Sequence, residues 1–190
     1  MHAAVADPVA PRRAVEIDGR HVYVFDGLLA GVGEYVQALS RAPFTRTEIA
    51  RPDTAGYRHW VTETRLDLLA RQPILALTSN AIGRVRPGEH YRPYRAYTNV
   101  AVYGDMLFSH VDCLPEQREL TALWYLCEEW DLEWGGETVF FDSQDEIACA
   151  VRPRPGRLVV FDGAIKHVGR PPNRLCYAPR YTFAIKFERG

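Results

Sequence analysis

The sequence lacks the features that mark several large classes of protein. No stretch approaches the roughly 20 consecutive apolar residues of a membrane span. The opening residues, MHAAVADPVAPRR, place an aspartate and two prolines where a secretory signal peptide needs an uninterrupted apolar core. We therefore expect no membrane partner and a cytoplasmic location.

An excess of charge of one sign is also missing, because 24 acidic and 23 basic residues leave a formal net charge of −1. Such a chain offers no electrostatic reason to bind nucleic acid. Its four cysteines are widely spaced and form no CxxC pair, which argues against a zinc ribbon or a disulfide scaffold. Hydrophobic residues make up 47% of the 190 positions, enough to build the core of one globular domain.

The single domain, residues 1–190, is predicted to have two segments of different character. The first, residues 1–88, should hold a loose arm over its first dozen residues, then short strands and supporting helices. The helices are expected over 32–41 and, as one or two, between 67 and 85.

The second segment, residues 89–190, is predicted to be the β-rich core of the domain. It contains eight short runs rich in β-branched and aromatic residues, separated by Gly, Pro, Asp or Asn turns, as in a jelly roll or barrel. Several runs are apolar on both faces, so the N-terminal helices should cover one sheet from outside. The fold class is mainly β with N-terminal helices.

One of these runs, FSHVDC, carries two polar side chains that a core strand would not need. Alternate residues of a strand point to the same face, so His110 and Asp112 should project together. A buried carboxylate is costly unless it is paired or bound to metal, although His110 alone could be an ordinary satisfied histidine. His167, 55 residues beyond Asp112, could return across the barrel as a third ligand. Two histidines and an aspartate form the facial triad typical of non-haem Fe(II), with zinc as the competing metal.

The last run, RYTFAIKF, places an arginine and a hydroxyl on the face opposite its aromatic side chains. A buried Arg180 needs an anion, and its planar fork suits a carboxylate, to which Thr182 could add a hydrogen bond. A dicarboxylic keto acid that chelates the metal would offer that carboxylate. Arg180 could instead pair with an acid of the chain itself, and Arg174, in a loop, is the rival anchor.

The order of these motifs resembles a known family. His110-x-Asp112, WGGETVFF, PRPGRLVVFDG, His167 and Arg180-x-Thr182 are similar to the Fe(II)/2-oxoglutarate-dependent dioxygenases, in particular their prolyl-4-hydroxylase-like branch. The likeness covers about residues 94–188. It implies a double-stranded β-helix (jelly roll, cupin-like) core.

The resemblance also implies roles for individual residues. His110, Asp112 and His167 would bind Fe(II) and Arg180 would bind 2-oxoglutarate. Tyrosines on the strands before and after the metal motif contact 2-oxoglutarate in the family, and Tyr103 and Tyr125 match those places. Their alternative role is ordinary aromatic packing. The cofactors implied are Fe(II), 2-oxoglutarate and O2, with ascorbate as a reductant. Because a metal-binding Asp is present, halogenation is disfavoured.

The implied reaction is hydroxylation of an unactivated C–H of a small metabolite, such as an amino acid or a biosynthetic intermediate, with release of succinate and CO2. Arg95, Tyr97 and Trp60 are the candidate substrate residues, chosen by type and by their position before the barrel. Two alternatives stay open: prolyl-hydroxylase-like modification of a protein partner, and a metal-binding cupin-like protein without oxygenase activity. Desaturation or cyclisation would use the same ligands, and the oligomeric state is not predicted.

Overall fold

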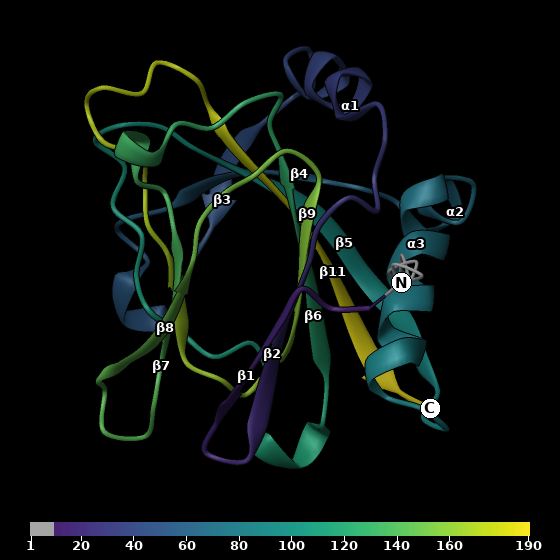
Figure 1. Ribbon diagram of the computed structural model, residues 1–190. Coiled ribbons are helices and arrows are strands. Elements are labelled where there is room, and N and C mark those ends of the chain that lie inside the picture. Colours follow the sequence, from purple (N-terminus) through teal and green to yellow (C-terminus); the bar gives the residue numbers. More distant parts are fainter. Residues whose placement is uncertain (1–9) are drawn as a thin grey trace, which may run out of the picture.

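The computed structural model describes residues 10–190, so most of the expected N-terminal arm lies outside the described residues. Two sheets face each other, and helices lie against the outer face of the larger one (Figure 1). The larger sheet has the order β1-β2-β9-β6-β11-β5-β4-β3 and the smaller has the order β10-β7-β8. The mainly β architecture of the protein is the double-stranded β-helix expected from the sequence.

The strands of the larger sheet are β1 (Arg13–Ile17), β2 (Arg20–Phe25), β3 (Thr45–Glu48), β4 (His59–Glu63), β5 (Tyr91–Ala101), β6 (Leu120–Leu126), β9 (Arg157–Asp162) and β11 (Arg180–Arg189). Those of the smaller sheet are β7 (Thr138–Phe141), β8 (Ile147–Val151) and β10 (His167–Gly169). The helices are α1 (Val32–Leu39), α2 (Leu66–Leu69) and α3 (Pro73–Val85).

The helices form where the sequence predicts them, because their apolar positions recur at helical spacing. Pro73 occupies the first turn of α3, where its missing N–H costs nothing. Helices α2 and α3 bury Leu69, Ile74 and Ile82 against apolar side chains of β6, β9 and β11. Within this layer the Trp124 indole donates a hydrogen bond of 2.9 Å to Thr78 Oγ1. The helices therefore cover the sheet whose strands are apolar on both faces.

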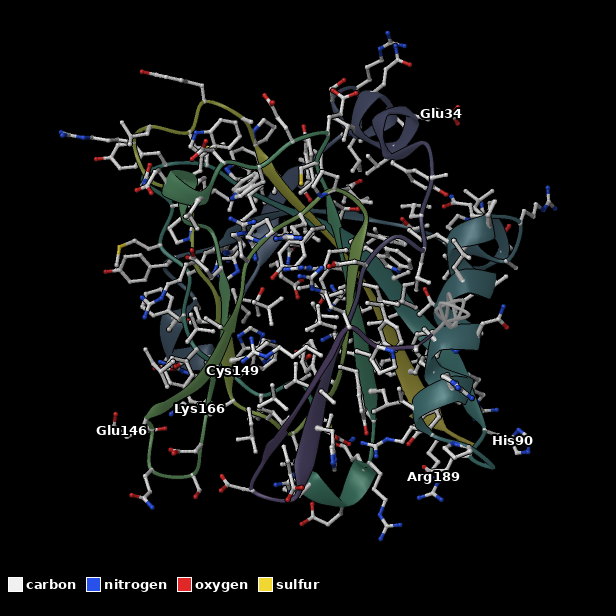
Figure 2. All side chains as sticks on the ribbon, viewed as in Figure 1. Glu34, His90, Glu146, Cys149, Lys166 and Arg189 are labelled. Atoms are coloured by element: carbon white, nitrogen blue, oxygen red, sulfur yellow. The ribbon has the colours of Figure 1, made fainter. Side chains whose placement is uncertain are left out.

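A second apolar layer fills part of the space between the two sheets. It includes Tyr125, Phe140, Cys149 and Phe161, contributed by strands of both sheets. Figure 2 shows side chains throughout this space, with the labelled Cys149 on β8. The cavity described below, which is lined by His110, Asp112 and His167, lies among strands of the same two sheets.

The structure differs from the sequence prediction at residues 106–113, which were expected to form a strand. The segment contributes only an isolated bridge between His110 and His167. The larger sheet also draws strands from both sides of residue 88, so the division of the chain at that point stays a prediction. Among the described residues, none of the helices has the length and apolarity needed to cross a bilayer.

Candidate metal and co-substrate site

Backbone hydrogen bonds hold residues 110–112 against the start of β10 and the loop before it. The His110 N–H donates to the His167 carbonyl, and the His167 N–H donates back, both at 2.9 Å. The Asp112 N–H donates to the Gly163 carbonyl at 2.7 Å. Main-chain hydrogen bonds thus bring together segments that are more than 50 positions apart in the sequence, as the metal prediction required.

The three predicted ligands converge on one point. Nε2 of His110 lies 3.4 Å from Oδ1 of Asp112, and Nε2 of His167 lies 3.7 Å from Oδ2. One potential ligand atom from each residue lies within 4.8 Å of the others. Three donors at this spacing on one side of a point are what a facial triad needs.

Both imidazoles are oriented through their second ring nitrogen. His110 Nδ1 lies 3.1 Å from the Phe108 carbonyl oxygen, and His167 Nδ1 lies 2.9 Å from the Ile165 carbonyl oxygen. A carbonyl only accepts, so each Nδ1 carries the proton and each Nε2 keeps a lone pair for a metal. Burial also lowers the pKa of His167 to about 4, which keeps its imidazole neutral.

The carboxylate of Asp112 is buried and strongly held. Its Oδ2 accepts a hydrogen bond of 2.6 Å from the Thr121 hydroxyl and forms an ion pair with the Lys186 ammonium. Burial would raise the pKa of Asp112, but the positive charge of Lys186 holds it well below its usual value. The carboxylate is therefore ionised and ready to bind a cation without first losing a proton.

Arg180, at the beginning of β11, lines the same cavity as the three predicted metal ligands. Its Nε donates to the Gly136 carbonyl at 2.6 Å, and Nη2 donates to Thr138 Oγ1 at 3.0 Å. Its guanidinium lies 5.4 Å from the centre of the Tyr125 ring. No ion pair joins it to a carboxylate in the part of the chain that the structure describes. A fully buried cation held only by neutral groups is set up to receive an anion.

The alternation predicted for β11 holds, because Arg180, Thr182, Ala184 and Lys186 all line the cavity. Lys186 is the residue that the sequence analysis missed. It occupies the next cavity-facing position of the same period-two pattern, which was the signal available to find it. Arg174, the rival anchor, is exposed and lies outside the cavity lining.

The two tyrosines expected to touch 2-oxoglutarate lie in different surroundings. Tyr103 is 63% exposed and does not line the cavity, so the expectation that it sits on the strand before the metal motif is wrong. Strand β5 ends at Ala101, and the chain then turns at Gly104, which has φ of 93°. Tyr125 is buried behind Arg180, with its hydroxyl hydrogen-bonded to Thr138 Oγ1 at 2.6 Å.

Of the three substrate candidates, only Tyr97 lines the cavity. The Arg95 guanidinium lies 4.1 Å from the centre of the Tyr97 ring, but its charge is taken up by ion pairs with Glu48 and Glu63. Trp60 is 38% exposed and also lies outside the lining. Trp60 alternates with His59 on β4 and so points away from the cavity, whereas Arg95 shares a face of β5 with Tyr97 but lies beyond the cavity lining.

Two further polar side chains line the cavity without a partner. The Nε2 atom of His59 and the Oδ1 atom of Asn99 are buried and have no hydrogen-bond partner in the structure. Buried polar atoms are rarely left unsatisfied. Their position on the cavity wall supports the presence of a ligand there. His59 neighbours Trp60 in the sequence and faces the opposite side of β4.

Comparison with known proteins agrees with this geometry. The profile of a family described as the 2OG-Fe(II) oxygenase superfamily matches residues 98–187, the stretch that contains the three convergent ligands and Arg180. Residues 98–187, just under half of the chain, therefore carry the signature of this superfamily, as the resemblance implied. This match and the geometry of the site support a non-haem iron, 2-oxoglutarate-dependent oxygenase that uses Fe(II), 2-oxoglutarate and O2. No curated protein sequence matches the chain.

Three of the similar solved structures share the fold at low sequence identity. A 2OG-Fe(II) oxygenase family oxidoreductase from Burkholderia pseudomallei is 14% identical, with a TM-score of 0.63 over 89% of this chain and 84% of the other. A Trichoplax adhaerens prolyl hydroxylase, in complex with a hypoxia inducible factor peptide, is 17% identical, with 0.64 over 88% and 82%. HygX from Streptomyces hygroscopicus, with nickel, 2-oxoglutarate and hygromycin B, is 16% identical, with 0.61 over 88% and 82%.

The side chains of this oxygenase fit its metal. Two imidazole nitrogens and one ionised carboxylate are the donor set of a non-haem Fe(II) site, and three residues leave positions for 2-oxoglutarate and O2. The family match favours an oxygenase over a cupin-like protein without oxygenase activity.

Proposed function

We propose that this oxygenase hydroxylates an unactivated C–H of a small metabolite while converting 2-oxoglutarate to succinate and CO2. The observation that carries the proposal is the buried Arg180, which has no carboxylate partner among the described residues and shares its cavity with His110, Asp112 and His167. A dicarboxylic keto acid can chelate the metal at one end and place a carboxylate against Arg180 at the other.

Each residue of the site would then have one task. His110, Asp112 and His167 hold Fe(II), which supplies the oxidising chemistry when it is bound. Arg180 binds the distal carboxylate of 2-oxoglutarate through its planar fork, and Thr182 donates a further hydrogen bond. Tyr125 packs behind the guanidinium and fixes its position rather than contacting the co-substrate.

A small substrate is supported by the cavity, which has a volume of about 80 Å³ and includes the apolar side chains Leu107, Phe108 and Leu123. Such walls exclude water from the reacting carbon. HygX, one of the similar structures, is complexed with the small molecule hygromycin B.

A protein partner is the second candidate, and one observation favours it. Large apolar side chains are exposed along the segment that leads to the metal ligands: Val102, Tyr103, Met106, Val111 and Leu114. Exposed apolar groups near a site can dock a peptide, and the Trichoplax prolyl hydroxylase is complexed with one. Turnover that requires a peptide rather than a free metabolite would establish this second reading.

The test of the site is an anaerobic titration of metal-free protein with Fe(II) and then 2-oxoglutarate, followed by the visible charge-transfer band of the chelate. We expect Arg180→Ala to weaken 2-oxoglutarate binding by more than about tenfold, because a charge-assisted bidentate contact is lost. Arg174→Ala is the matched control and should bind as the wild type does. Equal weakening by both changes would refute the assignment of Arg180.

The reaction itself is tested by succinate release in air with ascorbate as reductant, using small metabolites and peptides as substrates. A product heavier by one oxygen atom supports hydroxylation. A product lighter by two hydrogen atoms would instead show desaturation or cyclisation.

A further inference from the structure

A lysine inside the cavity points to the chemical class of the substrate. The chain has two lysines, Lys166 and Lys186, and only Lys186 lies in the cavity. Its ammonium pairs with Asp112 and donates to Thr121 Oγ1 at 3.0 Å. It also lies 5.9 Å from the centre of the Tyr97 ring, and its side chain is 8% exposed.

Asp112 can neutralise Lys186 fully only while no metal is bound. In the working enzyme the same carboxylate also neutralises part of the charge of Fe(II). A ferrous ion brings two positive charges and Arg180 and Lys186 bring one each, whereas Asp112 brings one negative charge and 2-oxoglutarate two. One positive charge remains unmatched in a largely buried site, where an unpaired charge is costly.

We propose that the substrate is a small organic acid whose carboxylate binds Lys186, so that a neighbouring C–H faces the iron. This inference rests on the proposed function and names its substrate class. A carboxylate supplies the single negative charge that the site lacks. A phosphate monoester carries about −1.5 to −2 charges at neutral pH and would overshoot it. Arg95 cannot take this role, because Glu48 and Glu63 already pair with it.

The position of Lys186 also separates the two anions of the reaction. Arg180 and Lys186 are six residues apart on one strand, so their Cα atoms are about 20 Å apart at roughly 3.3 Å per residue. The distal carboxylate of 2-oxoglutarate would bind near the beginning of β11. The substrate carboxylate would bind on the far side of the triad, where Asp112 meets Lys186.

The experiment uses trifluoroacetate and its neutral counterpart trifluoroacetamide as probes. Both are titrated anaerobically into the protein loaded with Fe(II) and saturating 2-oxoglutarate, and 19F NMR line broadening reports binding near the paramagnetic metal. We expect the acid to bind at least about tenfold more tightly than the amide, as for a desolvated charge-assisted contact. Equal binding of acid and amide would overturn the proposal.

Variants identify the cation responsible. Lys186→Gln and Lys186→Met should abolish the preference for the acid. Both variants are measured at Fe(II) and 2-oxoglutarate concentrations that saturate each of them, because they also lose the ion pair that holds Asp112. Lys166→Met is the matched control and should keep the preference, because Lys166 lies outside the cavity near Glu146 and pairs with Asp145 (Figure 2). If the preference survives in both Lys186 variants, the anion binds the metal or another cation, and the proposal is wrong.

The wild-type comparison tests the proposal without those variants, should either of them fail to fold. Its failure can also be told apart from failure of the proposed function. If the wild-type protein shows the charge-transfer band but no preference for the acid, only the proposed substrate class is refuted. If it shows no band, the proposed 2-oxoglutarate site is refuted as well.

Discussion

Lys186 and Asp112 form an ion pair inside the cavity, on an oxygen that Thr121 also contacts. Both donors bind Oδ2 of the carboxylate, and Oδ1 is the oxygen that faces His110 at 3.4 Å. The carboxylate is therefore fixed in orientation before any metal arrives. A ligand held in this way loses little freedom when it binds an ion, which favours binding.

The first prediction concerns the Thr121 hydroxyl. Thr121→Val keeps the shape of the side chain but removes the 2.6 Å hydrogen bond to Asp112. We expect Fe(II) affinity to fall by about tenfold, the lower end of the range for groups that orient metal ligands. Anaerobic metal titration of the purified variant measures this. Thr45→Val, at an exposed position of β3, is the control. An unchanged dissociation constant would show that Lys186 alone orients the carboxylate.

The second prediction concerns Gly136, whose carbonyl accepts the Arg180 Nε hydrogen bond. Gly136 has φ of 81°, and a Cβ there would lie 2.9 Å from Trp130 and 3.3 Å from Arg180 Cδ. Gly136→Ala should displace the guanidinium and weaken 2-oxoglutarate binding by about tenfold or more, since a misplaced anchor loses its bidentate contact.

Gly135→Ala separates this effect from backbone strain. Gly135 also has positive φ, of 67°, but a Cβ there would contact no atom closer than 3.8 Å. Both variants should lose stability, because each forces alanine into a left-handed conformation. Only Gly136→Ala should lose 2-oxoglutarate affinity in the charge-transfer titration. Equal losses of affinity would assign the effect to strain in the turn.

The sequence predicted those parts of the site that depend on period-two alternation within a regular strand. Arg180 and Thr182 face the cavity because β11 is unbroken from Arg180 to Arg189. The same alternation continues through Ala184 to Lys186, so Lys186 could have been found by following the pattern along the strand. The helices were predictable for a similar reason, since their apolar spacing and Pro73 are local signals.

The parts that failed depend on where regular structure stops. Tyr103 follows the end of β5, so alternation no longer determines its direction. His110 and Asp112 do share a site, but main-chain bonds to His167 and Gly163 place them there rather than an extended strand. Such long-range pairings leave no local trace in the sequence. Arg95 was misjudged because its partners, Glu48 and Glu63, lie on two other strands.

The third prediction concerns the pH dependence of the metal-free protein. Burial lowers the pKa of His167 to about 4, below its ordinary value of 6.5. Between these values the unfolded chain binds a proton and the folded chain does not, so stability falls as the pH drops from about 6.5 to about 4. The full loss is on the order of 3 kcal/mol of unfolding free energy.

Urea denaturation of the metal-free protein at several pH values measures this slope. His167→Gln should flatten it, because the variant has no group there to titrate. His90→Gln is the control, since His90 is exposed near the C-terminus (Figure 2) and should leave the slope unchanged. If His167→Gln keeps the wild-type slope, other groups cause the loss of stability.

The last prediction concerns Asp26 and Arg157, which join the end of β2 to the beginning of β9. Nε and Nη2 of Arg157 donate to the two carboxylate oxygens at 2.7 and 2.9 Å, and the arginine side chain is 9% exposed. Asp26→Asn leaves this buried guanidinium without its counter-charge, which should cost about 2 kcal/mol of unfolding free energy at pH 7. Asp67→Asn is the control and should cost less than about 1 kcal/mol, because its pair with Arg65 is exposed.

The difference between wild type and Asp26→Asn should also depend on pH. The hydrogen bond from Arg157 outweighs burial and lowers the pKa of Asp26 below its ordinary value of 3.8. A depressed carboxyl pKa contributes stability that is present above 3.8 and is lost as the pH falls through the lower, folded-state value. The two proteins should therefore differ at pH 7 and converge in acid, because both then carry a neutral side chain at position 26. A difference that persists unchanged below pH 3 would assign the effect to packing rather than to charge.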